Sequence, residues 1–308
     1  MTGCTVIGNV NVDLIVRADG LPPPGQERVV DEIDCRVGGA AANAALAMAA
    51  LGVTPRLVGC VGDDHFGRFL LDELSARDLA DDVRVVRGRP TGVSIAVGSA
   101  GRDRSFLLGL GALAAFDLGS IPREALEEPF VLLTGSFTLP ALRGEPTAEL
   151  LRTVRASGGR SFLDTGWDPE GWTKETQEEI RALLPLADVF LPNDLEATTL
   201  AGTHDVERAA RELRERSGGA VVVKRGADGA FAVGPDAEQL TVPAAEVPVV
   251  DTVGAGDAFD GALLVALSQG RPFGDAVRFA TEVGSTVVSR PSVDRYPTPA
   301  EVGHRDDG

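Results

Sequence analysis

Apolar positions fall into short runs that are separated by amphipathic segments along most of the chain. Strand-like runs lie at 130–133, 160–163, 188–191, 220–223, 230–233 and 239–242, and helical patterns lie at about 145–157, 175–184, 194–201, 205–216, 257–269 and 273–289. Apolar strands that alternate with helices are typical of βαβ units, in which helices cover both faces of a mostly parallel sheet. The pattern therefore predicts an α/β fold.

The N-terminal third of the chain has a different pattern. A buried strand is predicted at 5–10 and an alanine-rich helix at 40–51, which Gly52 is expected to end. Between them, residues 13–36 alternate apolar and polar positions around a proline-rich turn. Further along the chain, residues 93–108 have the pattern of a hairpin. We expect these additional strands to lie outside the main sheet.

Composition limits the classes of protein that fit. The 308 residues suffice for one large α/β domain with a small lobe attached. A formal net charge of −17 would repel a phosphate backbone, so no nucleic-acid partner is expected. The three cysteines lack paired spacing, which argues against a disulfide framework and a zinc site. Without a signal peptide or an apolar run near the ~20 residues that cross a bilayer, the prediction is a cytoplasmic protein with no membrane contact.

The segment 251–257 carries the clearest candidate chemistry. Small residues at Gly254, Ala255 and Gly256 allow consecutive backbone N–H groups to point at one place, and the helix that follows adds its positive dipole end. An anion can bind there, and Asp257 is placed to accept a proton from a hydroxyl group that attacks the anion. An ordinary glycine turn followed by a first-turn aspartate is the simpler alternative.

Three further motifs accompany this segment. They are Gly38-Gly39-Ala40-Ala41-Ala42-Asn43, Pro192-Asn193-Asp194-Leu195-Glu196 and Lys224-Arg225-Gly226-Ala227-Asp228-Gly229. In this order, and together with 251–261, they resemble the PfkB (ribokinase-like) family of carbohydrate kinases. The resemblance implies a ribokinase-like three-layer α/β/α sandwich with a mostly parallel central sheet, as a single domain over residues 1–308. A small β-strand lid would be formed by approximately 12–37 and 91–110.

The resemblance also assigns chemical roles. Asp257 would be the general base, and an anion hole for the transferred phosphoryl group would consist of the amides of Gly254, Ala255 and Gly256. Asn193 and Glu196 would position Mg²⁺ through water near the ATP phosphates. Side chains three residues apart share one helix face, which suits a cation that keeps its water, but the same pair also fits a cap at a helix N-terminus.

The two substrates are placed by the same resemblance. The nucleotide would be bordered by Lys224, Gly226, Gly229 and Thr281, and the acceptor by Asn11, Asp13, Gly38, Gly39 and Asn43. Asp251 and the carbonyl group of Val253 keep one half of the family's K⁺ site. The other half departs, because Val293-Asp294-Arg295-Tyr296-Pro297 stands where Gly-Ala is usual. K⁺ is therefore a hypothesis, and the polar tail from Asp294 is expected to be partly loose.

Together these features predict an ATP-dependent sugar kinase that phosphorylates a hydroxymethyl group. A nucleoside kinase, with Phe106 of the lid against the base, is the alternative within the family, and a catalytically silent sugar or nucleotide sensor is the alternative of another class. Residues 134–136 lack the acid of ribose-specific members. No arginine follows Asp164 where 2-keto-3-deoxygluconate kinases bind a carboxylate, so that substrate is disfavoured. The acceptor is left open, and a homodimer through the lid is expected.

Overall fold

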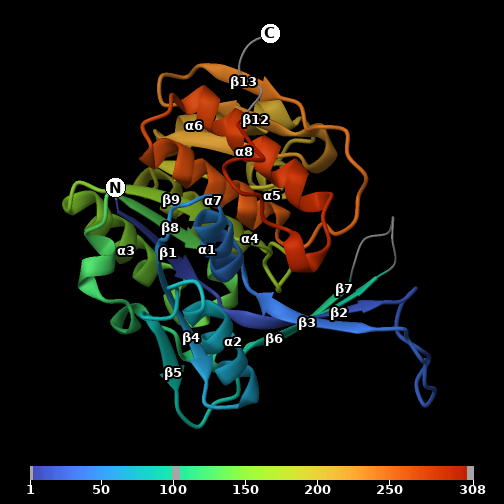
Figure 1. Ribbon diagram of the computed structural model, residues 1–308. Coiled ribbons are helices and arrows are strands. Elements are labelled where there is room, and N and C mark those ends of the chain that lie inside the picture. The colour runs from blue at the N-terminus through green and yellow to red at the C-terminus, as the bar shows by residue number, and fades with distance from the viewer. Residues whose placement is uncertain (1–2, 99–104, 304–308) are drawn as a thin grey trace.

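A computed structural model describes residues 3–98 and 105–303, which form two β-sheets with helices around the larger one (Figure 1). The large sheet has the strand order β13-β12-β11-β10-β9-β8-β1-β4-β5. Its strands are β1 (Cys4–Gly8), β4 (Arg56–Gly62), β5 (Val83–Val86), β8 (Phe130–Thr134), β9 (Arg160–Asp164), β10 (Val189–Phe190), β11 (Ala220–Lys224), β12 (Ala230–Val233) and β13 (Gln239–Val242). Neighbours from β5 to β11 are parallel, and β12 and β13 are antiparallel additions at one edge.

Helices cover both faces of this sheet. They are α1 (Ala40–Ala50), α2 (His65–Ser75), α3 (Glu145–Ala156), α4 (Lys174–Leu183), α5 (Asp194–Ala201), α6 (Val206–Ser217), α7 (Ala255–Ser268) and α8 (Phe273–Val288). One apolar core joins α1, α2, α7 and α8 to one face, and a second core joins α3 to α6 to the other. Successive strand residues serve opposite cores, as Val6 and Ile7 do. The predicted α/β/α sandwich is confirmed.

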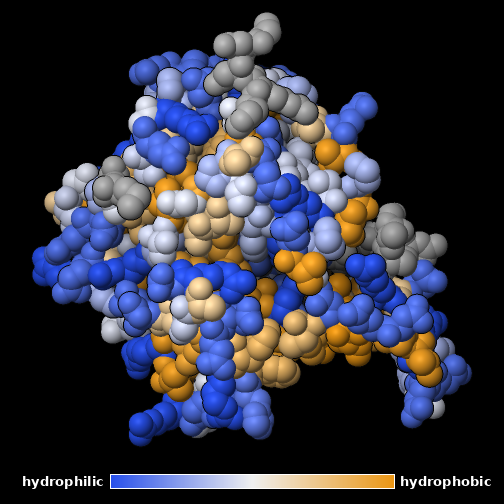
Figure 2. Space-filling view, viewed as in Figure 1, coloured by the Kyte–Doolittle hydropathy of each residue, from blue (hydrophilic) through white to orange (hydrophobic). Residues whose placement is uncertain are grey.

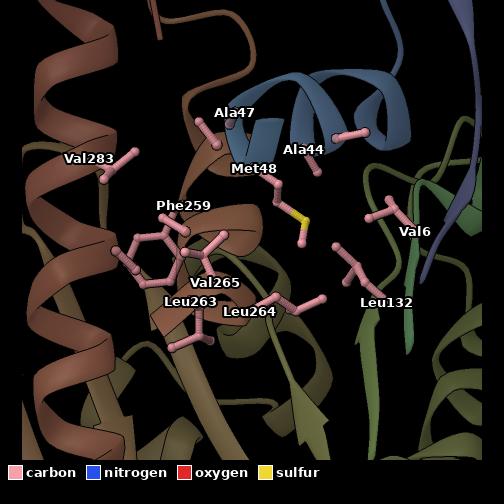
Figure 3. Packing of buried hydrophobic residues seen from close by; sticks show 14 of the residues in the cluster. Val6, Ala44, Ala47, Met48, Leu132, Phe259, Leu263, Leu264, Val265 and Val283 are labelled. Atoms are coloured by element: carbon pink, nitrogen blue, oxygen red, sulfur yellow. The ribbon is translucent and has the colours of Figure 1, made fainter. Parts of the chain in front are cut away.

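The first core brings α1 against α7 (Figure 3). Met48 of α1 points into the space between the two helices and β8, toward Leu132 and Leu264. A Cβ atom on Gly261 would lie 2.6 Å from the carbonyl oxygen of Ala44, so a larger residue would force the helices apart. This close approach sets the distance between polar residues at the N-terminal ends of α1 and α7.

The small sheet has the strand order β3-β2-β6-β7 and extends away from the body (Figure 1). Its strands are β2 (Asn11–Arg17), β3 (Ile33–Gly38), β6 (Val93–Gly98) and β7 (Ser105–Gly109). The predicted hairpin is confirmed by the antiparallel β6–β7 pair, while its tip at 101–103 lies outside the described residues. In the alternating segment 13–36, residues 13–17 belong to β2, and strand structure resumes only at Ile33.

Apolar side chains stay exposed on the small sheet, which the sequence motifs predicted to be a lid and which is called the lid below. Ile33, Phe106 and Leu107 are each more than half exposed, and Figure 2 shows apolar surface along the lid next to the body. Ile33 lies on the edge strand β3, and Phe106 and Leu107 are neighbours on the opposite edge strand β7, so their side chains point to opposite faces of the small sheet. The small sheet therefore keeps apolar side chains in contact with solvent.

The segment after α8 contradicts one prediction. The tail from Asp294 was expected to be partly loose, but Arg295 is only 5% exposed and Pro297 is buried as well. Arg290 and Glu301 also form an ion pair across this segment, at 2.6 Å. The tail returns to the body because a buried guanidinium group and an aromatic ring anchor it. Within the described part of the chain, no helix has the length and apolar character needed to span a membrane.

Candidate active site

The candidate site lies where the carboxyl ends of the parallel strands meet the start of α7. Asp164 ends β9 and Lys224 ends β11, and their side chains meet at 2.9 Å. Ligands of open α/β sheets bind at this edge because the loops after parallel strands converge there. The fold therefore brings together residues that are up to about 250 positions apart in the sequence.

The glycine turn before α7 has the geometry that its sequence predicts. Gly254 is the N-cap residue with φ 76° and ψ 7°, a left-handed conformation that glycine adopts without steric cost. The turn is held by Val253 N, which donates to Asp251 Oδ1 at 3.0 Å. Ala255 N donates to the carbonyl oxygen of Thr252 at 3.3 Å, so this amide is partly engaged within the turn. Gly256, in contrast, is exposed toward the site.

Asp257 is a half-buried carboxylate in the first turn of α7. Asn43 Nδ2 donates to its Oδ2 atom at 2.9 Å, and the hydroxyl group of Tyr296 donates to Asn43 Oδ1 at 3.0 Å. Because Tyr296 requires the oxygen of the amide, the nitrogen is directed at Asp257. Burial raises the pKa of Asp257 above its ordinary value, and the Asn43 donor opposes that rise. The predicted base is thus held in place by a chain of two hydrogen bonds.

We predict that Asn43→Leu moves the acid limb of the kcat–pH profile to higher pH, by about one unit. Without the donor, the pKa of Asp257 rises further, and a base that must be unprotonated loses activity earlier as the pH falls. Steady-state kinetics between about pH 5 and 9 measure the limb. Tyr296→Phe, which only releases the Asn43 amide, should give a smaller shift in the same direction. An unchanged limb in both variants would contradict the role of Asn43.

Lys224 joins two carboxylates beneath the glycine turn. Its Nζ atom lies 2.9 Å from Asp164 Oδ2 and 3.0 Å from Asp260 Oδ2. Burial alone would lower the pKa of Lys224, but the two carboxylates outweigh it and raise the pKa, so the side chain is charged. A Cβ atom on Gly256 would lie 3.8 Å from Nζ, which places a full positive charge at the turn. The sequence suggested a nucleotide edge for Lys224 but did not reveal Asp260.

Asn193 and Glu196 form the helix cap that was the alternative interpretation of their spacing. Asn193 Oδ1 accepts from Glu196 N at 2.8 Å, and Glu196 Oε2 accepts from Asn193 N at 2.9 Å, which together make a capping box on α5. Burial raises the pKa of Glu196 to about 8, with the negative charge of Asp164 adding to the effect. The cap and a magnesium role are compatible, since each cap bond occupies one oxygen and the carboxyl group has two.

Few side chains in the site could bind a metal ion directly. Among residues 3–98 and 105–303, no three His, Cys, Asp or Glu side chains are grouped so as to hold an ion directly. Mg²⁺ bound through its own water needs fewer protein ligands, because this small cation usually keeps several waters. A carboxyl group that also caps a helix fits such indirect contact, and it does not fit direct coordination by a protein cage.

The predicted acceptor residues converge at the base of the lid. Asn11 Nδ2 donates to Asp13 Oδ1 at 2.8 Å. A Cβ atom on Gly38 would lie 2.1 Å from the Asp13 carboxyl carbon, so the paired strands tolerate only glycine there. Gly39, with φ 94°, begins α1, and this start places Asn43 one turn further along the helix. Burial raises the pKa of Asp13 to about 6, although the positive charge of Arg36 opposes the rise.

Arg36 and Arg295 are site residues that the sequence interpretation missed. Arg36 Nη1 lies 2.7 Å from Asp251 Oδ2, the carboxylate assigned to the K⁺ hypothesis. A guanidinium group therefore already meets one of the two proposed K⁺ ligands. Arg295 Nη2 would lie 3.0 Å from a Cβ atom on Gly254. The only sequence signal for Arg295 was the departure from Gly-Ala in this segment.

The predicted nucleotide edge is less closely defined. Gly226 and Gly229, with φ 54° and 82°, shape the turn between β11 and β12. A Cβ atom on Gly229 would lie 2.0 Å from the carbonyl oxygen of Val242, which excludes other residues there. Thr281 lines a hollow of about 480 Å³ between β13 and α8, but its hydroxyl group donates to the Val277 carbonyl oxygen at 2.8 Å. The turn and the hollow lie on the same side of the molecule, beside the large sheet's antiparallel edge.

Comparison with known proteins decides the family. Residues 1–300 match the model described as pfkB family carbohydrate kinase. The chain belongs to this family. It is an ATP-dependent carbohydrate kinase, and its fold is ribokinase-like, as the sequence motifs predicted.

Individual members of the pfkB family resemble the chain over most of its length. It is 32% identical over 271 residues to aminoimidazole riboside kinase of Salmonella typhimurium. The aligned region covers 86% of this chain and 80% of that protein. It is 31% identical over 292 residues to 1-phosphofructokinase of Haloferax volcanii, with 92% and 90% covered. The structure of Arabidopsis thaliana ribokinase complexed with ribose and ATP superposes with a TM-score of 0.80 at 25% identity, covering 97% and 96% of the two chains.

Proposed function

We propose that this kinase transfers the γ-phosphoryl group of ATP to a hydroxymethyl group of a small sugar, with Asp257 as the general base. The observation that carries the proposal is the Asp257 carboxylate, which lies in the first turn of α7 beside Gly254 and is held by Asn43 at 2.9 Å. A carboxylate next to an anion-binding helix start can take a proton from a hydroxyl group that attacks the anion. The relative with ribose and ATP bound supports both substrates.

In the proposed step, the hydroxymethyl oxygen bonds to the γ-phosphorus, the bond from that phosphorus to the β–γ bridging oxygen breaks, and Asp257 receives the hydroxyl proton. ADP leaves with the bridging oxygen. The amides of the Gly254–Gly256 turn and the positive end of α7 stabilise the phosphoryl oxygens. Lys224 adds a charge on the other side of the turn, close to Gly256. Positioning and electrostatic stabilisation are the main contributions in phosphoryl transfer, and this arrangement supplies both.

The remaining residues support the two substrates. Asn11 and Asp13 would hold acceptor hydroxyl groups, because an amide can donate and a carboxylate can accept. Glu196, with the carboxyl oxygen that the cap leaves free, would hold Mg²⁺ through water, and the metal would neutralise charge on the ATP phosphates. The Gly226–Gly229 turn would border the nucleotide. The lid would close over the acceptor and exclude water that would otherwise compete as phosphoryl acceptor.

A nucleoside kinase is the second candidate. The exposed ring of Phe106 on β7 gives the lid an aromatic surface on which a base could stack, and one relative is named aminoimidazole riboside kinase. The exposed apolar side chains of β3 and β7 support the proposal that two copies pair through their lids. An acceptor held by Asp13 at the lid base would be covered in either case.

A screen of ADP release with sugars and nucleosides as acceptors tests the proposal. We expect ATP turnover to depend on the acceptor and to be supported by at least one sugar, with phosphorus NMR placing the new phosphate on the hydroxymethyl oxygen. Turnover with nucleosides alone would favour the second candidate. ATP binding without turnover in the presence of any acceptor would instead indicate a silent sensor.

A further inference from the structure

Arg295 is a buried arginine with an unused hydrogen-bond donor. The residue is 5% exposed, its Nη2 atom has no hydrogen-bond partner, and its side chain forms no ion pair with any residue that the structure describes. Its contact is the ring of Tyr296, with the guanidinium carbon 5.1 Å from the ring centre. Removing a guanidinium group from water is costly, and a bound anion that accepts from the unused donor would offset part of that cost.

Arg36 has unused donors in the same neighbourhood. Nη1 is paired with Asp251, but Nε and Nη2 are buried and have no hydrogen-bond partner among residues 3–98 and 105–303. Arg36 stands directly opposite Asp13 in the β2–β3 ladder, so both side chains lie on the same face of the lid. Three buried guanidinium nitrogens, Nε and Nη2 of Arg36 and Nη2 of Arg295, therefore have no hydrogen-bond acceptor among the described residues.

Both arginines face the acceptor side of the site. Their charges act on Asp13, and Arg295 also acts on Asp257. Arg295 Nη2 and Asn43 Nδ2 would each lie 3.0 Å from a Cβ atom on Gly254, whereas Lys224 approaches the turn from Gly256. The nucleotide side of the turn therefore has its own cation, and the arginines are not needed for it.

Space for a ligand group exists beside these arginines. Arg36, Arg295 and Tyr296 line a hollow of about 450 Å³ between α1, the end of α2 and residues 292–296. Arg77 lies on the wall of the same hollow. The wall also carries Glu73, Asp294 and apolar residues of α1, so the arginines are the charged groups in it that can bind an anion.

We propose that the acceptor is an anionic sugar, whose phosphate or carboxylate group is bound by Arg36 and Arg295 while its hydroxymethyl group faces Asp257. The inference rests on the proposed kinase function and names its substrate class. Guanidinium groups suit both anions, because their planar donors match two oxygens at once. The missing arginine after Asp164 is no obstacle, since the arginines come from β3 and from the C-terminal segment.

Matched acceptor pairs test the inference with the intact enzyme. Ribose is compared with ribose 1-phosphate, fructose with fructose 1-phosphate, and glucitol with gluconate, with ADP release as the readout. We expect kcat/KM for the anionic member of at least one pair to exceed that of its neutral partner by about 30-fold or more. A preference in the phosphate pairs or in the carboxylate pair shows which of the two anionic groups the arginines bind.

Variants connect that preference to the two arginines. Arg295→Met and, independently, Arg36→Gln should each reduce the anionic-to-neutral ratio of kcat/KM by about 30-fold, whereas Arg295→Lys should retain part of it. Arg123→Met removes an arginine that is 83% exposed on its side chain, and it should leave the ratio unchanged. A ratio serves as the readout because a general loss of folded enzyme affects both substrates equally.

The possible failures are distinguishable. If neutral sugars are phosphorylated as well as anionic ones, or if neither arginine variant changes the ratio, the inference is wrong and the kinase function stands. If no acceptor of either kind supports ADP release, the proposed function itself fails.

Discussion

Asp257→Asn is expected to lower kcat by about 10²–10⁴-fold while ATP still binds, which is the usual contribution of a general base. The substitution keeps the size and polarity of the side chain but removes its ability to take the hydroxyl proton. Asn43 lies 2.9 Å from the carboxylate, so the replacement amide can still meet a polar neighbour. Steady-state kinetics measure kcat, and calorimetric titration with ATP should give a Kd within about threefold of wild type.

Two features make this prediction specific. Wild-type activity should fall as the pH drops through the raised pKa of Asp257, whereas the residual activity of Asp257→Asn should lack that limb. Asp72→Asn, an exposed aspartate on α2, controls for the loss of one negative charge and should retain wild-type kcat. Turnover of Asp257→Asn within about threefold of wild type would show that another group takes the proton.

Lys224→Met is expected to destabilise the protein by about 3–5 kcal/mol and to reduce activity strongly. The substitution leaves Asp164 and Asp260 buried without the cation that lies 2.9 and 3.0 Å from them. Two neighbouring carboxylates without a counter-charge cannot both remain ionised, so burial raises their proton affinity and the turn above them loses its positive charge. Urea unfolding measures the stability, and ADP release measures the activity.

The chain offers a matched control, because its only other lysine is Lys174. Lys174 is exposed at the start of α4, and Lys174→Met should change the unfolding free energy by no more than about 0.5 kcal/mol. The double variant Lys224→Met/Asp260→Asn removes one uncompensated charge and should recover part of the stability without recovering turnover. Recovery of turnover as well would assign Lys224 a purely structural role.

The local elements followed from the sequence. Alternating strands and helices predicted an α/β fold, and the glycines before Asp257 predicted a turn at a helix start, because both depend on neighbouring residues. The spacing of Asn193 and Glu196 allowed a helix cap as the alternative to a magnesium role, and the structure contains that cap. The order of the four motifs resembled that of the PfkB family, and this resemblance predicted the kinase activity.

The environment of these residues did not follow from the sequence. Asn43 and Asp257 are 214 positions apart, and Tyr296 is 253 positions from Asn43, so no local period relates them. Arg295 was placed in a loose tail because a polar, proline-containing end is usually solvated. Only the packed structure shows that this arginine is buried and that its Nη2 atom has no hydrogen-bond partner among the described residues.

The sequence by itself thus determined the α/β sheet and the glycine turn with Asp257 at the start of the helix that follows. The tertiary structure decided which charges surround that turn: Lys224 between two carboxylates on one side, and Arg36 and Arg295 on the other. The physical reason is the distance along the chain between the residues that interact. Turns and helix starts are fixed by neighbouring backbone groups, whereas the electrostatics of a buried site depend on side chains that meet only after the sheet and its helices have packed.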